Sequence, residues 1–80
     1  MDIILYTRPN CSLCEQAKAT LADFQNRFPY YLIEVDITTD EAAYALYRYR
    51  IPVFRIGERE VEAPISAEKL LAALERTGDS

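Results

Sequence analysis

Cys11 and Cys14 are the only cysteines of this 80-residue chain, and two residues separate them. Residues three apart on a helix have Cβ atoms about 5–6 Å apart, close enough for a disulfide after a small adjustment. Such a pair can pass between dithiol and disulfide with little backbone movement. The spacing therefore predicts thiol–disulfide exchange, in which one thiolate attacks a disulfide and the second thiol displaces the product.

The residues around the pair place it between a strand and a helix. Residues 3–6 form a short apolar run, Pro9 and Asn10 interrupt it, and a helical stripe begins at Cys14. The first N–H groups of a helix have no partner within it, and with the helix dipole they favour an anion such as a thiolate. Cys14 belongs to the buried stripe, whereas Cys11 precedes the first full turn. We therefore predict that Cys11 is the nucleophile and Cys14 the shielded resolving thiol.

Two structural thiols are the alternative interpretation of the pair. A bridge that closes so short a loop removes little entropy from the unfolded chain, which weakens that alternative. Zinc usually takes four Cys or His ligands, and the chain has no histidine. A zinc or iron–sulfur site would need thiolates from two subunits or from glutathione. We expect no bound cofactor and no metal site within one chain, and keep the dimeric metal carrier as an alternative.

Two basic residues lie close to the cysteines. Arg8 is three residues before Cys11. A cation there would stabilise the thiolate and hold a substrate carboxylate, or it would be a solvated loop charge, and the sequence leaves both possibilities open. Lys18, one turn after Cys14, is expected on the helix surface.

The hydrophobic pattern predicts one domain, over residues 1–80, with the order β-α-β-α-β-β-α. Strands are expected at residues 3–6, 31–36, 53–56 and 59–63, with a turn at Gly57. A helical crossover makes the first two strands parallel, and a hairpin makes the last two antiparallel. The fold class is therefore α/β, with a mixed four-stranded sheet and helices on both faces.

Three helices connect these strands. The apolar stripe of the first helix consists of Cys14, Ala17, Leu21, Phe24 and Phe28, and Pro29 is expected to end it. The capping-box sequence TTDE at residues 38–41 opens the second helix, whose expected inner face is Ala43, Leu46 and Tyr47. Ser66 is expected to cap the third helix, whose expected inner face is Ala67, Leu70, Leu71 and Leu74. We interpret Tyr44, Tyr47 and Tyr49 as core or half-buried packing, and Arg48 and Arg50 as a solvated helix end.

Composition restricts the partners. The net charge is −4 and the basic residues are scattered, which argues against nucleic acid. No apolar run approaches the ~20 residues of a membrane span. The N-terminus lacks the basic and apolar regions of a signal peptide, so we expect the chain in the cytoplasm. We also expect it to be a monomer.

The segment YTRPNCSLCEQAK, residues 6–18, resembles the active-site segment of glutaredoxins and small bacterial glutaredoxin-like proteins. Ile51, Pro52 and Val53 stand where that superfamily has its cis-proline motif. The resemblance implies a thioredoxin-like three-layer sandwich with strand order 2-1-3-4. It implies that Pro52 is cis and faces the cysteines, that the Ile51 backbone pairs with an extended substrate segment, and that Arg8 matches the family's basic residue.

The resemblance also implies the reduction of protein disulfides or glutathione mixed disulfides, with an electron donor as second partner. Glutaredoxins usually carry Cys-Pro-Tyr-Cys, whereas this chain has Ser12 and Leu13 between its cysteines. They also place two glycines before the last helix, and no glycine lies between Gly57 and Gly78 here. We therefore expect glutathione to be a poor reductant and a thioredoxin-reductase-type flavoprotein or another dithiol donor to be a better one. An inactive interaction module on the same fold remains an alternative.

Overall fold

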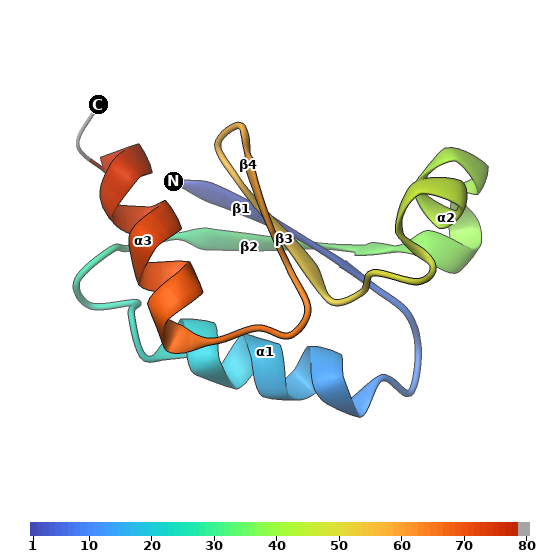
Figure 1. Cartoon of the computed structure of the whole chain (residues 1–80), viewed down its shortest axis with the longest axis horizontal. Coiled ribbons are helices and arrows are strands. Elements are labelled where there is room, and N and C mark those ends of the chain that lie inside the picture. The colour runs from blue at the N-terminus through green and yellow to red at the C-terminus, as the bar shows by residue number, and fades with distance from the viewer. Residues whose placement is uncertain (79–80) are drawn as a thin grey trace.

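The computed structural model describes residues 1–78 and has the order of elements that the sequence predicts (Figure 1). In chain order the elements are β1 (Asp2–Thr7), α1 (Ser12–Ala22), β2 (Tyr31–Asp36), the 3-10 turn η1 (Ile37–Thr39), α2 (Glu41–Tyr47), β3 (Val53–Ile56), β4 (Arg59–Glu62) and α3 (Ala67–Gly78).

The four strands form one sheet in the order β2-β1-β3-β4, which confirms the α/β fold and the strand order that the resemblance implies. β1 pairs in parallel with β2 and antiparallel with β3, and β3 pairs antiparallel with β4. In this register Leu5 of the central strand lies between Glu34 of β2 and Phe54 of β3. The loop that carries the cysteines therefore follows an interior strand, which is paired on both sides.

One face of the sheet packs against α1 and α3. Its main cluster consists of Ile3, Leu5, Phe54, Ile56 and Val61 from the strands and Ala17, Leu21, Leu70, Ala73 and Leu74 from the helices. Burying one large aliphatic side chain contributes about 1.5–3 kcal/mol relative to exposure. Ala17 and Leu21 continue the stripe of Cys14, so the same packing that holds α1 on the sheet fixes the cysteine pair.

The opposite face is covered in part by α2, which lies apart from α1 and α3 (Figure 1). Its buried cluster consists of Ile37, Ala43, Tyr47 and Val53, with Tyr6 and Ile51 packed against it. The Tyr6 ring stacks on the Tyr47 ring with centroids 4.0 Å apart. The tyrosine prediction is confirmed for Tyr47 alone.

Leu46, predicted on the inner face of α2, is 61% exposed, and Tyr44 and Tyr49 are exposed as well. These predictions are wrong because a helix of seven residues presents only one narrow stripe, here Ala43 and Tyr47, to the sheet. In α3 a similar correction applies: Ala67 is exposed, Leu71 is half-buried, and Ala73 is buried in place of Ala67.

α1 ends at Ala22, six residues before the predicted end. The chain continues in turns, in which the Phe24 N–H donates to Leu21 O at 2.9 Å. The Gln25 side chain then donates to Tyr30 O at 3.2 Å and accepts from Tyr30 N at 2.7 Å. This amide directs the chain into β2. Phe24 and Phe28 still pack against the main cluster from the turns, which explains why the apolar periodicity outlasts the helix.

The ends of the other helices follow side-chain caps. The Asp40 carboxylate caps α2 by accepting from Ala43 N at 3.1 Å. The threonines of the predicted capping box belong to η1 instead, where Asp36 accepts from Thr38 N at 2.9 Å. Ser66 Oγ accepts from Lys69 N at 3.2 Å, which confirms the predicted cap of the third helix. β4 ends at Glu62, one residue before its predicted end, and is an edge strand.

Candidate active site

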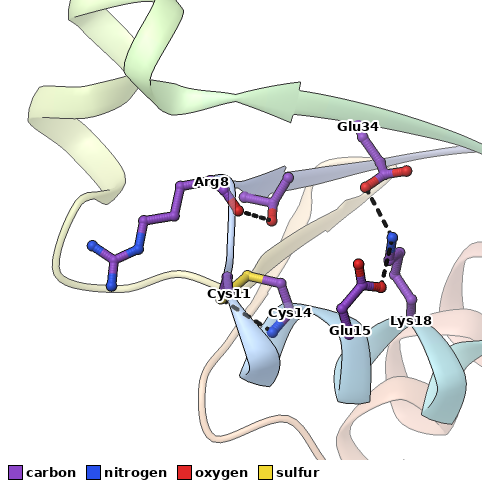
Figure 2. The surroundings of a disulfide bond; sticks show 7 residues. Arg8, Cys11, Cys14, Glu15, Lys18 and Glu34 are labelled. Atoms are coloured by element: carbon purple, nitrogen blue, oxygen red, sulfur yellow. Dashed lines mark hydrogen bonds and ion pairs between the residues drawn. A yellow bond between two sulfur atoms is a disulfide. The ribbon is translucent and has the colours of Figure 1, made fainter.

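Cys11 and Cys14 form a disulfide at the start of α1, with their Cα atoms 5.2 Å apart (Figure 2). Cys11 is the N-cap residue in an extended conformation, and its Sγ accepts from Cys14 N at 3.2 Å. The Cys11 sulfur therefore faces the unpaired N–H groups of the first turn, where negative charge is favoured.

The two sulfurs have different surroundings. Cys14 is 2% exposed and lies in line with the buried Ala17 and Leu21, whereas Cys11 is half-buried and lines an open groove. An incoming disulfide can reach Cys11 from solvent but reaches Cys14 only through Cys11. This difference is the one that the sequence analysis expected from the helical stripe.

A left-handed residue brings Cys11 to the helix start. Asn10 has φ of +60°, a conformation that asparagine tolerates better than most residues with a Cβ. In the sequence, Pro9 and Asn10 indicate only an interruption of the strand. The turn reverses the chain between β1 and α1, so that the cysteines lie beyond the C-terminal end of β1.

A groove of about 800 Å³ lies on the Cys11 side of the disulfide. It is lined by Thr7, Arg8, Pro9, Asn10, Cys11, Ser12, Glu15, Glu34 and Asp36, and we call it the charged groove. Lys18 adjoins it and bridges Glu15 at 2.8 Å and Glu34 at 3.2 Å (Figure 2). Hydrogen bonds to these two carboxylates raise the pKa of Lys18. Lys18 is thus a link between α1 and β2 rather than only the surface residue that the sequence suggests.

Arg8 lies on the rim of the charged groove and is exposed. Its guanidinium points away from the two sulfurs (Figure 2). In this arrangement the Arg8 guanidinium does not contact the sulfurs, and a role for Arg8 in holding a substrate carboxylate stays a prediction.

The Ile51–Pro52 peptide bond is cis, as the family resemblance implies, and Pro52 is buried. The Ile51 N–H donates to Tyr47 O at 3.1 Å. Because the Ile51 N–H already donates to Tyr47 O, the expected backbone pairing of Ile51 with an extended substrate would use the Ile51 carbonyl oxygen as acceptor.

A second groove, of about 520 Å³, lies on the other side of the cysteine motif. It is lined by Leu13, Gln16, Ala17, Thr20, Pro52, Ala63, Pro64 and Ile65, and we call it the uncharged groove. Leu13, between the cysteines, is 59% exposed. The Ala63–Pro64 bond is also cis, and no residue pattern around Pro64 predicts this.

A polar cluster holds the segment before Pro52 against β4. Tyr47 Oη donates to Glu60 Oε2 at 2.6 Å, and Arg50 pairs with Glu60 at 2.8 Å and with Glu62 at 3.3 Å. The hydrogen bond to Glu60 raises the pKa of Tyr47 to about 12, and the same bond together with Arg50 lowers the pKa of Glu60. The interpretation of Arg50 as a solvated helix end is therefore wrong. Glu60 and Glu62 alternate on one face of β4, but nothing in that pattern identifies Arg50 as their partner.

Within residues 1–78, no group of three or more His, Cys, Asp or Glu side chains is arranged to hold a metal ion. Over the same residues, none of the helices has the length and apolarity to cross a bilayer.

Comparison with known proteins agrees with this geometry. The model of a family described as glutaredoxin-like domain (DUF836) matches residues 2–75. A structural-genomics target protein from X. campestris is 37% identical, with a TM-score of 0.78 over 92% of this chain and 96% of its own. A protein from Nitrosomonas europaea, solved by NMR, is 26% identical, with a TM-score of 0.78 over 91% of this chain and 89% of its own.

A more distant likeness concerns the fold alone. Thioredoxin 1 from Thermosipho africanus is 16% identical to this chain, with a TM-score of 0.72 over 99% of this chain and 96% of its own. The sheet and the three helices therefore have the thioredoxin-like arrangement.

Proposed function

The chain belongs to the glutaredoxin-like domain family, and on that premise we propose that it is a thiol–disulfide oxidoreductase that reduces protein disulfides or mixed disulfides. One observation carries the proposal. A disulfide spans the first turn of α1, with a half-buried sulfur at the N-cap and a buried sulfur behind it. This arrangement gives one thiol that meets substrates and a second that meets only the first.

In the first step the reduced chain attacks with the Cys11 thiolate. The thiolate forms a bond to one sulfur of the substrate disulfide, the substrate S–S bond breaks, and the other substrate sulfur leaves as a thiolate that takes up a proton. N–H groups of the first turn of α1, among them Cys14 N, stabilise the Cys11 thiolate before the attack.

In the second step Cys14 resolves the mixed disulfide. Its sulfur, deprotonated to a thiolate, bonds to Cys11 Sγ, and the bond between Cys11 and the substrate breaks. The substrate leaves as a second thiol, so two electrons have passed to it and the chain holds the Cys11–Cys14 disulfide. The Cα separation of 5.2 Å lets this bond close within one helical turn.

A second partner must return the electrons. We propose a dithiol donor or a thioredoxin-reductase-type flavoprotein. The reason is that this chain has Pro64 and Ile65 before α3, where glutaredoxins have two glycines. We also propose that the chain acts as a monomer in the cytoplasm. In that compartment a reducing donor can keep the cysteine pair in its active dithiol form.

Stoichiometric electron transfer tests the proposed function. The chain is reduced with dithiothreitol, separated from the reagent, and mixed with an excess of a protein that contains an accessible disulfide. We expect thiols to appear on the substrate as the Cys11–Cys14 disulfide forms, both followed by alkylation and mass spectrometry. A chain that stays reduced while the substrate keeps its disulfide would exclude the function.

A further inference from the structure

The uncharged groove lies beside the cysteine motif, because its lining includes Leu13, which lies between the two cysteines in the chain, together with the cis-proline Pro52. Its lining is aliphatic except for the neutral side chains of Gln16 and Thr20, and it includes no Asp, Glu, Lys or Arg. The charged groove on the other side of the same disulfide is lined by Arg8 and three carboxylates. A substrate that approaches Cys11 therefore meets two surfaces of opposite chemical character.

The wall of the uncharged groove offers few backbone donors. Pro52 and Pro64 have no N–H, and the Ala63 N–H already donates to Pro52 O at 3.1 Å. The neighbouring Ile51 N–H is bonded to Tyr47 O. Recognition on this side must therefore come mainly from contact with side chains rather than from a ladder of backbone hydrogen bonds.

These features select against charged occupants. Glutathione carries carboxylates and an ammonium group, and placing any of them in this groove would remove water from a charge while the lining supplies no charged partner. An aliphatic side chain has no polar group whose hydration would be lost in the groove. It would also cover the apolar surface of Leu13, which is 59% exposed, and of Pro64 and Ile65.

We infer that the substrate of this site is an extended protein segment in which an uncharged aliphatic residue flanks the disulfide-bonded cysteine and lies in the uncharged groove. The inference rests on the proposed function and names its substrate class. Leu13 lines the groove and is bonded to Cys14, so a residue next to the substrate cysteine is expected to reach the groove while the cysteine sulfur lies at Cys11. The exchange itself is the two-step transfer already described, with the reduced chain as the source of both electrons.

Peptide disulfides test the inference. Four peptides differ only in the residue next to cysteine, which is Leu, Ser, Glu or Lys, and each cysteine is bonded to 2-mercaptoethanol. The chain, reduced beforehand, is mixed with each peptide, and the second-order rate constant is divided by that of dithiothreitol with the same peptide. This division removes the intrinsic reactivity of each disulfide. We expect the Leu peptide to react about tenfold faster than both charged peptides, with Ser between them.

Each outcome separates the inference from the proposed function. Equal normalised rates for all four peptides would overturn the inference and leave the function standing. A fast Lys peptide with a slow Glu peptide would overturn it as well, because the net charge of −4 would then account for the preference. Glutathione disulfide reacting faster than the Leu peptide would contradict it directly. No reaction with any peptide would remove the proposed function together with the inference.

A charge placed in the groove gives the second test. Gln16→Lys adds a cation to the groove lining, and Ala19→Lys adds the same charge to an exposed position of α1 outside it. We expect Gln16→Lys to lower the ratio of Leu to Glu rates severalfold and Ala19→Lys to keep the wild-type ratio. The same ratio in Gln16→Lys as in Ala19→Lys would show that the groove does not seat the flanking residue.

Discussion

The charged and uncharged grooves lie on either side of one disulfide and differ in what builds them. The charged groove is formed by residues of β1, of the start of α1 and of β2, and the Lys18–Glu34 salt bridge beside it crosses between α1 and β2. The uncharged groove is closed by residues farther along the chain, Pro52 and the segment from Ala63 to Ile65. Cys11, the proposed nucleophile, thus lines the first groove, and the cis-proline lines the second.

The difference indicates a division between chemistry and selection. In the proposed function Cys11 reacts because of its position at the helix start, which depends on nearby residues. In the inference drawn above, the choice of substrate depends instead on a surface assembled by tertiary contacts, which can change without altering the cysteine motif. A variant of one groove is therefore expected to change one property of the site and to leave the other in place.

The largest loss of disulfide reduction is expected from a change at Cys11, whose residue lines the charged groove. Cys11→Ser removes the thiolate that the first turn of α1 stabilises, and we expect disulfide reduction to fall to the background rate. The measurement is thiol release from a protein disulfide by the prereduced variant. Activity at the wild-type level would show that Cys14, although 2% exposed, is the attacking thiol.

Cys14→Ser leaves the attack intact and removes the resolving step. We expect the variant to accumulate a mixed disulfide with its protein substrate, detectable on a non-reducing gel and dissolved by dithiothreitol. Its turnover of a protein disulfide is expected to be a small fraction of the wild-type turnover. Wild-type turnover without a trapped species would mean that the buried sulfur has no part in the reaction.

The third prediction concerns the reductant and the uncharged groove. Each lost backbone hydrogen bond to a charged group costs about 1.5–3 kcal/mol, or roughly ten- to hundredfold in recognition. We therefore expect glutathione to reduce the Cys11–Cys14 disulfide at least tenfold more slowly than it reduces an ordinary dithiol glutaredoxin. Reduction by thioredoxin reductase with NADPH is measured in parallel. Equal rates of the two proteins with physiological glutathione would return this chain to the glutathione-dependent class.

The smallest effect is expected on the free energy of unfolding, from a change in the polar cluster of Tyr47, Arg50 and Glu60 that holds the segment before Pro52. The pKa of Glu60 is lowered by Tyr47 and Arg50, so its contribution to stability is present above the unfolded-state pKa near 4.5 and is lost as the pH falls through the lower folded-state value. We expect Glu60→Gln to lower the free energy of unfolding at pH 7 by about 0.5–1 kcal/mol, since these side chains are partly exposed. The difference from wild type is expected to shrink below pH 4.5.

Glu58→Gln is the matched control for that comparison, because it removes the same charge from the adjacent turn. Urea unfolding at two pH values measures both variants. A pH-independent loss in Glu60→Gln would attribute the effect to packing rather than to charge.

Local signals in the sequence predicted the order and pairing of the elements. The apolar run at residues 3–6 predicted a buried strand, and the turn at Gly57, where φ is +62°, predicted the β3–β4 hairpin, whereas the central place of β1 was implied only by the family resemblance. The position of Cys11 and Cys14 at the helix start follows from the same short-range pattern. These features depend on residues within a few positions of one another, and periodicity reports them well.

Features that depend on distant residues were missed. Arg50 pairs with Glu60 and Glu62, ten and twelve positions away, and no periodicity encodes that contact. The early end of α1 was missed for a different reason, since it accompanies hydrogen bonds between the Gln25 side chain and the backbone of Tyr30, which hydrophobic periodicity does not report. The uncharged groove needs Leu13 and Ile65 together, so only the folded chain defines it.

The central place of β1 also sets when the site can form during synthesis. β1 is complete within the first residues, but its antiparallel partner β3 begins only at Val53. An isolated helix of eleven residues, such as α1, is marginal in water, and the main cluster that holds it includes Phe54 and Ile56. A ribosome-bound chain that ends before β3 therefore carries both cysteines without the ordered first turn that sets Cys11 apart. The nascent protein then exposes an ordinary pair of thiols, and the arrangement proposed for thiol–disulfide exchange forms when the C-terminal half joins the sheet.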